Sequence, residues 1–275
     1  MSDPRPIGVF DSGVGGLTVV RAIVDLLPHE PILYVGDNAR FPYGPRPLEE
    51  IRRFALEIAG YLVSRDVKML VVACNSIEVA AISEVAEAHG VPVVGVIDPG
   101  ARAAVRATRN RRIGLIGTEA TVRSGAYDRA VAATGADVAL ASAACPAFVD
   151  HVERGDTSSD ELLGLARGYL EPLKAEGIDT LILGCTHYPM LSGLLQMVMG
   201  EGVVLVSSAE ETAKDVYAGL RSSGLLRRDG SEPVHGFLTT GDPEAFRAVA
   251  HHFLGPGIGG IGAVQVRPVE GARWS

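Results

Sequence analysis

The sequence predicts an α/β fold of two similar lobes with a cleft between them, each lobe a mostly parallel sheet flanked by helices. Three observations support this prediction. Short apolar runs recur along the 275 residues, stretches with helical periodicity separate them, and features of the first half return in the second. The hydrophobic content of 47% is ordinary for a globular protein and excludes a disordered or collagen-like chain.

Each predicted strand is an apolar run that stops at a turn signal. We expect strands at Pro6–Phe10, Ile32–Val35, Met69–Ala73, Val91–Ile97, Ile113–Ile116, Val138–Ala143, Thr180–Leu183 and Val203–Val206. The longer stretches between them include predicted helices at Leu48–Leu62, Glu78–His89 and Asp160–Ala175. Continuous apolar strands that alternate with helices are typical of βαβ units around a buried parallel sheet.

The chain also repeats itself. Ile7–Ser12 matches Ile113–Thr118 at an offset of 106 residues, and Arg65–Ser76 matches Glu176–His187 at an offset of 111. Buried strands resemble one another in general, which is the simpler explanation. Against it, both copies of the second match place a cysteine and then two polar residues directly after the strand, so we interpret the match as a true repeat.

Cys74 and Cys185 stand at these equivalent positions. Ligands of parallel sheets bind outside the carboxyl ends of the strands, so two facing lobes direct both thiols into one cleft. Two thiols on opposite sides of a small molecule suit stereoinversion at carbon, because one removes a proton and the other delivers one. The ordinary thiol pKa of about 8.5 makes both protonation states accessible, and a helix N-terminus after each cysteine favours the thiolate.

The third cysteine, Cys145, precedes Pro146 and has no partner in the repeat, so we interpret it as structural. The glycine-rich turn 11–16 lacks the third glycine of a dinucleotide-binding fingerprint, because Thr18 stands there. Its backbone N–H groups suit a carboxylate instead. Asp11 either orients the Cys74 thiol or caps the following helix.

Further candidates follow the same strand ends. The loop Pro42-Tyr43-Gly44 offers a hydroxyl and free amides to a polar ligand, although as a loop alone it has no function. Asn75 and Ser76, and likewise Thr186 and His187, offer donors and acceptors for the charged ends of an amino acid. Asn75 with Glu78 also fits a capping box, and His187 can move a proton to or from Cys185 or be an ordinary surface histidine.

Composition excludes several classes of function. The chain has 25 basic and 33 acidic residues and 5% aromatic residues, which argues against nucleic-acid binding. No apolar run is long enough to span a membrane, and residues 1–8 do not form a secretory signal, so we expect a cytoplasmic protein. Three cysteines predict neither a disulfide framework nor a metal site. None of the three lysines ends a strand, which argues against pyridoxal chemistry.

The ordered motifs resemble those of the glutamate racemase family over nearly the whole chain, apart from residues 257–275. They are Gly8–Leu17, Gly36-Asp37 to Pro42-Tyr43-Gly44, Ala73–Ser76, Ala144-Cys145-Pro146, Val152–Gly155, Leu183–Pro189 and Thr239–Pro243. One departure follows Asn75: the family usually has Thr and then small residues, whereas this chain has Ser76-Ile77-Glu78. Ser76 keeps the hydroxyl, so we expect the chemistry to be retained. Ile77 and Glu78 place the local helix packing in doubt instead.

The resemblance implies a cofactor-independent, two-thiol interconversion of L- and D-glutamate that supplies D-glutamate for peptidoglycan. It implies that Cys74 deprotonates D-glutamate and Cys185 deprotonates L-glutamate, and that Asp11, His187 and Glu153 assist. The implied substrate-binding residues are Asp11, Ser12, Tyr43, Gly44, Asn75, Ser76, Thr186 and His187. It further implies a homodimer. Within each chain, we expect residues 1–98 and 209–275 in one lobe and residues 99–208 in the other.

Two alternatives remain at this point. One is a racemase of the same superfamily that acts on aspartate or a hydantoin. The other is a non-catalytic two-lobed binding module, which has no need of paired thiols.

Overall fold

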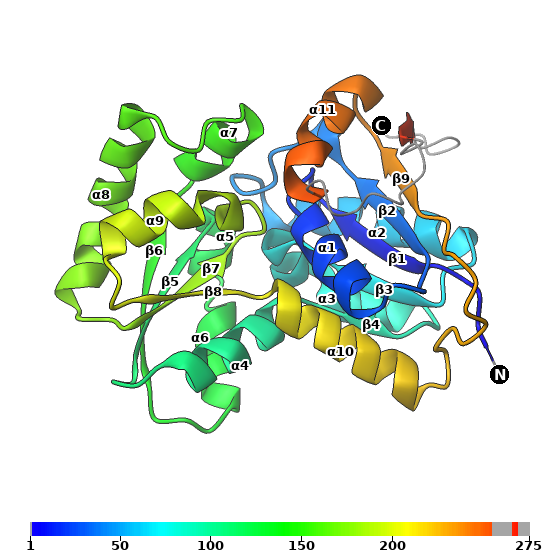
Figure 1. Cartoon of the computed structure of the whole chain (residues 1–275), viewed down its shortest axis with the longest axis horizontal. Helices are drawn as coiled ribbons and strands as arrows, with labels where there is room; N and C mark the ends of the chain where they lie inside the picture. The colour runs from blue at the N-terminus through cyan, green and yellow to red at the C-terminus, as the bar shows by residue number, and fades with distance from the viewer. Residues whose placement is uncertain (1, 255–265, 269–275) are drawn as a thin grey trace.

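The computed structural model describes residues 2–254 and 266–268 and contains two parallel sheets side by side (Figure 1). The first has the strand order β10-β9-β2-β1-β3-β4 and the second β6-β5-β7-β8. The strands are β1 Ile7–Asp11, β2 Ile32–Gly36, β3 Met69–Val72, β4 Val93–Val94, β5 Arg112–Gly117, β6 Ala139–Ala144, β7 Thr180–Gly184, β8 Val204–Ser207, β9 Gly236–Thr239 and β10 Val266–Pro268. This arrangement confirms the predicted α/β class with two lobes.

The repeat inferred from the sequence corresponds to strand order. In the first sheet β1 lies between β2 and β3, with β4 beyond β3, and in the second sheet β5 lies between β6 and β7, with β8 beyond β7. All the pairings between these strands are parallel. The carboxyl ends of β3 and β7 are therefore equivalent places in the two sheets.

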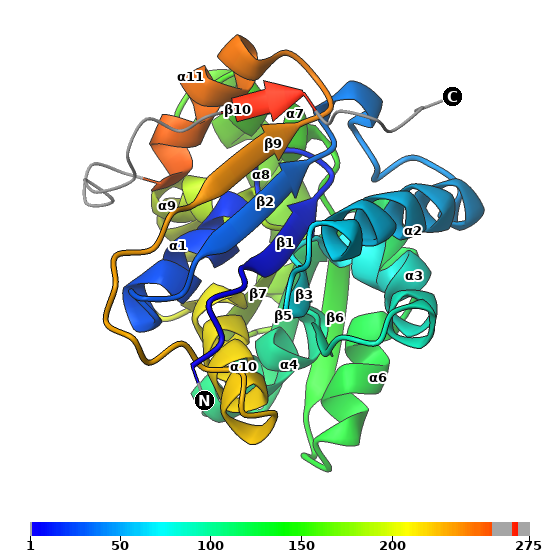
Figure 2. The same ribbon diagram turned by 90° about the vertical axis from the view of Figure 1, so that its right-hand side faces the viewer.

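Helices cover both faces of each sheet. The helices are α1 Leu17–Leu26, α2 Leu48–Ser64, α3 Asn75–Ala88, α4 Ile97–Ala107, α5 Glu119–Arg123, α6 Ala126–Ala133, α7 Ala147–Glu153, α8 Asp160–Ala175, α9 Ser192–Met199, α10 Ala209–Ser222 and α11 Pro243–Leu254. We call the first sheet with α1–α3, α10 and α11 the first lobe, and the second sheet with α4–α9 the second lobe (Figures 1 and 2).

The alternating faces of β1 show how the sheet is buried. Val9 belongs to the core cluster that contains α1, α10 and α11, whereas its neighbour Phe10 packs with α2 and α3. Consecutive side chains of a strand point to opposite faces, so helices on both faces demand a continuously apolar strand. None of the helices in residues 2–254 is long and apolar enough to cross a membrane.

Two predicted boundaries are wrong near the crossing between the lobes. The strand expected at Val91–Ile97 is limited to β4, and Ile97 begins α4. Pro99 and Asp98 in the first helical turn favour this start, since proline lacks an N–H there and the acidic side chain complements the helix dipole. Helix α3 begins at Asn75 rather than Glu78, with Cys74 as its N-cap, so the capping box proposed for Asn75 does not form.

A buried ion pair joins three separate segments of the first lobe. The ammonium of Lys68, just before β3, donates to Glu30 at 2.5 Å and to the carbonyl of Asp3. The other carboxylate oxygen of Glu30 accepts the backbone N–H of Arg227, which follows α10. The Lys68 and Glu30 side chains are almost completely buried, at the amino end of β3 and away from Cys74.

Candidate active site

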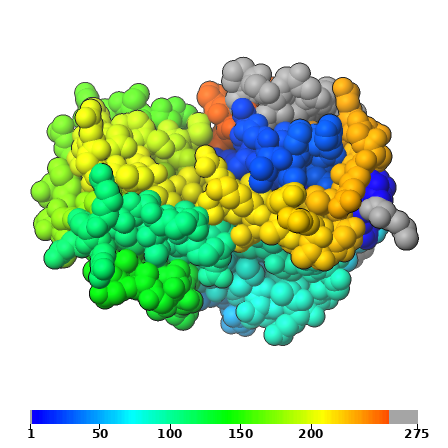
Figure 3. Space-filling view, turned by 60° about the horizontal axis from the view of Figure 1, so that its bottom comes forward, coloured from blue at the N-terminus to red at the C-terminus, as the bar shows by residue number. Residues whose placement is uncertain are grey.

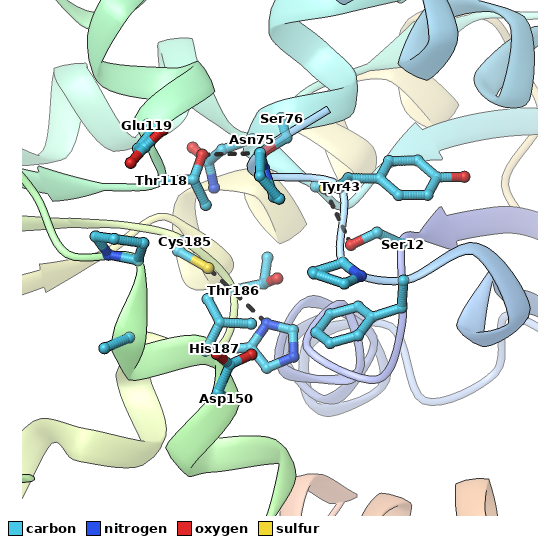
Figure 4. A pocket seen from close by; sticks show the side chains of 18 residues that line it. Ser12, Tyr43, Asn75, Ser76, Thr118, Glu119, Asp150, Cys185, Thr186 and His187 are labelled. Carbon is cyan, nitrogen blue, oxygen red and sulfur yellow. Dashed lines mark hydrogen bonds between the residues drawn. The ribbon is translucent and has the colours of Figure 1, made fainter. Parts of the chain in front are cut away.

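A cavity of about 340 Å³ lies between the lobes and is lined by the ends of both sheets (Figure 4). This volume is at the lower end of the range for small-molecule sites. Both predicted thiols line it. The other lining residues are Ser12, Phe41, Pro42, Tyr43, Gly44, Pro45, Asn75, Ser76, Thr118, Glu119, Pro146, Ala147, Val149, Asp150, Thr186 and His187.

On the first-lobe side, Cys74 follows β3 and has an exposed fraction of 6%. Its thiol donates to the hydroxyl of Ser12 at 3.7 Å. Burial raises the pKa of this thiol well above its ordinary value, and the negative charge of Asp11 raises it further. The thiol is therefore held in its protonated form, as a proton donor requires.

Asp11 lies behind this thiol rather than in the cavity wall. One carboxylate oxygen accepts the backbone N–H groups of Gly13 and Gly16, which shapes the turn before α1. The other oxygen is buried without a hydrogen-bond partner in the described part of the chain. Burial raises the pKa of Asp11, and the positive charge of His187 opposes that rise. Asp11 is not the N-cap residue of α1, a position that Gly16 occupies.

The glycine-rich turn has a steric reason. A Cβ atom on Gly15 would lie 2.5 Å from both Nδ1 of His187 and the Thr186 hydroxyl. The first lobe therefore approaches the second-lobe residues with bare backbone at this point. A side chain at position 15 would push the turn away from His187. This close approach explains why glycine stands here, and no phosphate ligand is needed to account for it.

On the second-lobe side, Cys185 follows β7 with an exposed fraction of 7%, and its Sγ lies 3.8 Å from Nδ1 of His187. The other ring nitrogen of His187 lies 2.7 Å from a carboxylate oxygen of Glu153 (Figure 4 shows the thiol and the ring). Burial alone would lower the pKa of His187, but the hydrogen bonds to Cys185 and Glu153 raise it to about 10. The ring is therefore charged at neutral pH.

The helix expected directly after Cys185 is absent. A 3-10 turn at Tyr188–Leu191 comes first, and α9 begins only at Ser192. A helix dipole acts within about one turn of the helix end, so α9 is too far away to favour a thiolate at Cys185. The charged ring of His187 lies beside this thiol instead, whereas α3 begins directly after Cys74. The two thiols thus have different neighbours.

Glu153→Gln is expected to lower the pKa of His187 by about 1 to 3 pH units, because the neutral amide no longer stabilises the charged ring. The pKa is measured by NMR titration of the His187 ring in the intact protein, starting from about 10 in the wild type. Asp150→Asn is the matched control, since Asp150 lies three residues earlier on α7 and lines the cavity. Equal decreases in the two variants would contradict a specific Glu153–His187 pair.

Tyr43 departs from its predicted use. Its hydroxyl donates to the buried carboxylate of Asp37, and its ring points away from the cavity (Figure 4). Asp37 also accepts from Arg40 and from the Thr240 hydroxyl, so this carboxylate anchors the whole loop. The Tyr43 hydroxyl is thus occupied by Asp37 and its carbonyl by the N–H of Arg46, so the loop lines the cavity without offering either group.

The residues after Cys74 hold the lobes together. The amide oxygen of Asn75 accepts from the hydroxyl of Tyr127 in α6, and the hydroxyls of Ser76 and Thr118 lie 3.0 Å apart (Figure 4). Thr118 was missed as a site residue, although the repeat pairs it with Ser12. Glu119, directly after Thr118, was missed with it, and Asp150 was missed because it lies on α7, away from any strand end.

Cys145 fits its structural interpretation. It is fully buried, its thiol donates to the Ala143 carbonyl at 3.8 Å, and it does not line the cavity. Burial raises the pKa of this thiol to about 12. Within the described residues, no group of three or more His, Cys, Asp and Glu side chains is arranged to hold a metal ion.

Known proteins resemble this chain in sequence over most of its length. A family model described as Asp/Glu/Hydantoin racemase matches residues 7–216. The glutamate racemase of Parafrankia sp. (strain EAN1pec) is 58% identical over 98% of this chain and 96% of that protein. The chain belongs to the glutamate racemase family. It is therefore an amino-acid racemase, an isomerase, and the non-catalytic binding module is excluded.

Solved structures of the glutamate racemase family have the same two-lobed fold. Isoform RacE1 from Bacillus anthracis superposes with a TM-score of 0.90 at 42% identity, over 96% of this chain and 97% of that one. The enzyme from Francisella tularensis, solved in complex with D-glutamate, gives 0.87 at 34% identity over 96% and 97%.

Proposed function

We propose that this chain interconverts L- and D-glutamate through Cys74 and Cys185, without a cofactor. One observation carries the proposal: thiols at equivalent ends of two related sheets line a single cavity. The name of the relative from Parafrankia sp. and the D-glutamate complex of a structural neighbour support glutamate as the substrate.

In the L-to-D direction, the thiolate of Cys185 removes the Cα proton of L-glutamate. The electron pair stays on the substrate as a carbanion delocalised into the α-carboxylate. The thiol of Cys74 then delivers its own proton to the opposite face, which leaves Cys74 as a thiolate and Cys185 as a thiol. Solvent then removes the proton gained by Cys185, which lies beside the already charged ring of His187, and restores the proton of Cys74. The reverse reaction exchanges the two roles, with Asp11 accepting the proton of Cys74.

The lining chemistry suits an amino dicarboxylate. His187 is the basic side chain among the lining residues, so neutral groups bind the carboxylates. Hydroxyls of Ser12, Thr118 and Thr186 and the amide of Asn75 are available, together with backbone N–H groups. The carboxylates of Glu119 and Asp150 offer attraction to the substrate ammonium.

Incubation with L-glutamate in D2O tests the proposal. We expect D-glutamate that carries deuterium at Cα, because the delivered proton comes from a solvent-exchanged thiol. The product is separated by chiral chromatography and its isotope content is measured by mass spectrometry. Parallel incubations with L-aspartate and a hydantoin test the alternative substrates. Faster turnover of either one would overturn glutamate as the substrate.

We also propose that the protein acts in the cytoplasm, where its product enters peptidoglycan, and that it forms a homodimer. The lobes are proposed to comprise residues 1–98 with 209–275, and residues 99–208. Residues 255–265 and 269–275 of the first lobe lie outside the described part of the chain. Sedimentation equilibrium of the full chain tests the dimer, and a single monomer mass would refute it.

A further inference from the structure

We propose that Glu78 is a positioning residue that sets the separation of the two lobes, by capping the helix through which the chain enters the second lobe. Its kinetic consequences rest on the proposed function. Glu78 stands four residues after Cys74 and its backbone N–H donates to the Cys74 carbonyl, in the first turn of α3. With Ile77, it replaces the small residues that are usual at this point of the family motif.

The Glu78 carboxylate serves α4 rather than its own helix. One oxygen accepts the backbone N–H groups of Val96 and Ile97, at 2.5 and 3.0 Å. Val96 is the N-cap residue of α4, and no side chain of the cap position makes this bond. The first N–H groups of a helix have no partner within it, and a negative charge there also complements the helix dipole. Glu78 therefore supplies the missing cap from another helix.

Gly95 makes this contact sterically feasible. A Cβ atom on residue 95 would lie 2.4 Å from the carboxyl carbon of Glu78 and 2.4 to 2.5 Å from its oxygens. The carboxylate occupies the space that any side chain at position 95 would need. Glu78 and Gly95 thus form a matched pair, and a substitution at either one breaks the same contact.

The capped helix lies where the lobes meet. Helix α4 packs against α6 and the second sheet, and on its other side against α10 of the first lobe. Two ion pairs, Arg102–Asp215 and Arg106–Glu211, join α4 to α10. Figure 3 shows the face on which α10, in yellow, extends from the second lobe across the first. A shift of α4 therefore moves one lobe relative to the other.

The same turn of α3 lines the cavity. Asn75 and Ser76 contact Tyr127 and Thr118 of the second lobe, and Cys74 precedes them. Glu78 adds a third contact from this turn, to the start of α4 where the chain crosses between the lobes. Proton transfer at two opposite faces depends on the distance between the two thiols, and a misplacement of about 1 Å can reduce a rate by about 100-fold.

The test compares Glu78→Ala, Glu78→Gln, Gly95→Ala and the double variant Glu78→Ala/Gly95→Ala in the full-length protein. Assays at pH 8 keep Glu78 ionised, because burial raises its pKa to about 7 although the two N–H groups oppose that rise. Glu78→Ala and Gly95→Ala are each expected to lower kcat by about 10- to 100-fold, with a much smaller change in KM. Glu78→Gln keeps an acceptor oxygen and should recover part of the loss.

The double variant should be no worse than Glu78→Ala alone, because a Cβ on residue 95 has room once the carboxylate is gone. Losses that multiply would overturn the shared contact, and an unchanged kcat in either single variant would overturn the positioning role. If Glu78→Ala does not fold, Gly95→Ala and Glu78→Gln still decide the question.

Asp179→Ala is the matched control. The Asp179 carboxylate also accepts two backbone N–H groups, those of Arg109 and Asn110 after the end of α4, but it precedes β7 at the end opposite to Cys185. This variant should lose stability and keep its kcat. Amide exchange at Val96 and Ile97 is a readout independent of activity: it should accelerate in the Glu78 and Gly95 variants, and unchanged exchange would refute the cap even if no racemisation is found.

Discussion

Cys74→Ser and Cys185→Ser are each expected to lower the rate of racemisation by about 10²- to 10⁴-fold, the usual contribution of a positioned acid or base. A serine hydroxyl occupies nearly the same space but is a far weaker acid than a thiol, so one face of Cα loses its proton carrier. The measurement is the initial rate of change in optical rotation, starting from each enantiomer of glutamate in turn.

The isotope content of the recovered substrate separates the two thiols. With Cys74→Ser, Cys185 still removes the proton of L-glutamate and returns a deuteron to the same face. L-glutamate should therefore gain deuterium while little D-glutamate forms. Cys185→Ser should give the mirror result with D-glutamate. Deuterium in the opposite enantiomer for each variant would reverse the proposed assignment of the faces.

Cys145→Ser is the matched control for the loss of a thiol. Its side chain is buried outside the cavity and donates to the Ala143 carbonyl, which a hydroxyl can also reach. Activity should stay within a few-fold of the wild type. Undiminished turnover in both Cys74→Ser and Cys185→Ser would refute the two-thiol mechanism.

Lys68→Ala is expected to lower the free energy of unfolding by about 3 to 5 kcal/mol, because Glu30 is left as an uncompensated charge in the core. The pair is almost completely buried, so solvent screens it little. Urea denaturation followed by circular dichroism measures the change. The kcat of the folded fraction should be unaffected, since the pair lies at the amino end of β3.

Lys214→Ala provides the comparison. Lys214 pairs with Glu211 on the surface of α10, with 61% of its side chain exposed. Exposed pairs contribute at most about 1 kcal/mol. A similar decrease in both variants would show that the buried pair has no special weight.

Much of the site could be predicted because its chemistry follows strand ends. Cys74 and Cys185 were identified from a repeat at an offset of 111 residues. Its other match, at an offset of 106, pairs Ser12 with Thr118, which could have been found in this way. The local signals failed where the partner comes from elsewhere. The Tyr43 hydroxyl donates a hydrogen bond to Asp37, and Asp37 also accepts one from Thr240, about two hundred residues further along the chain.

Glu78 is a second residue whose partner could not be predicted from local spacing. Its spacing from Asn75 fits a cap of its own helix, and α3 does start there, but the carboxylate turns to the backbone of α4 instead. Sequence spacing describes neighbours within one helix. It contains no information about an approach that depends on a glycine in another segment.

The order of strands in the first sheet has a consequence for synthesis on the ribosome. Strand β2 is flanked by β9, which is translated after the whole second sheet. Until Gly236–Thr239 has left the ribosome, β2 is an open edge, and such an edge invites pairing with another chain. The second sheet comes from one uninterrupted stretch and can close first. Substitutions in β9 should therefore reduce the yield of soluble protein during expression more than they reduce turnover by the molecules that do fold.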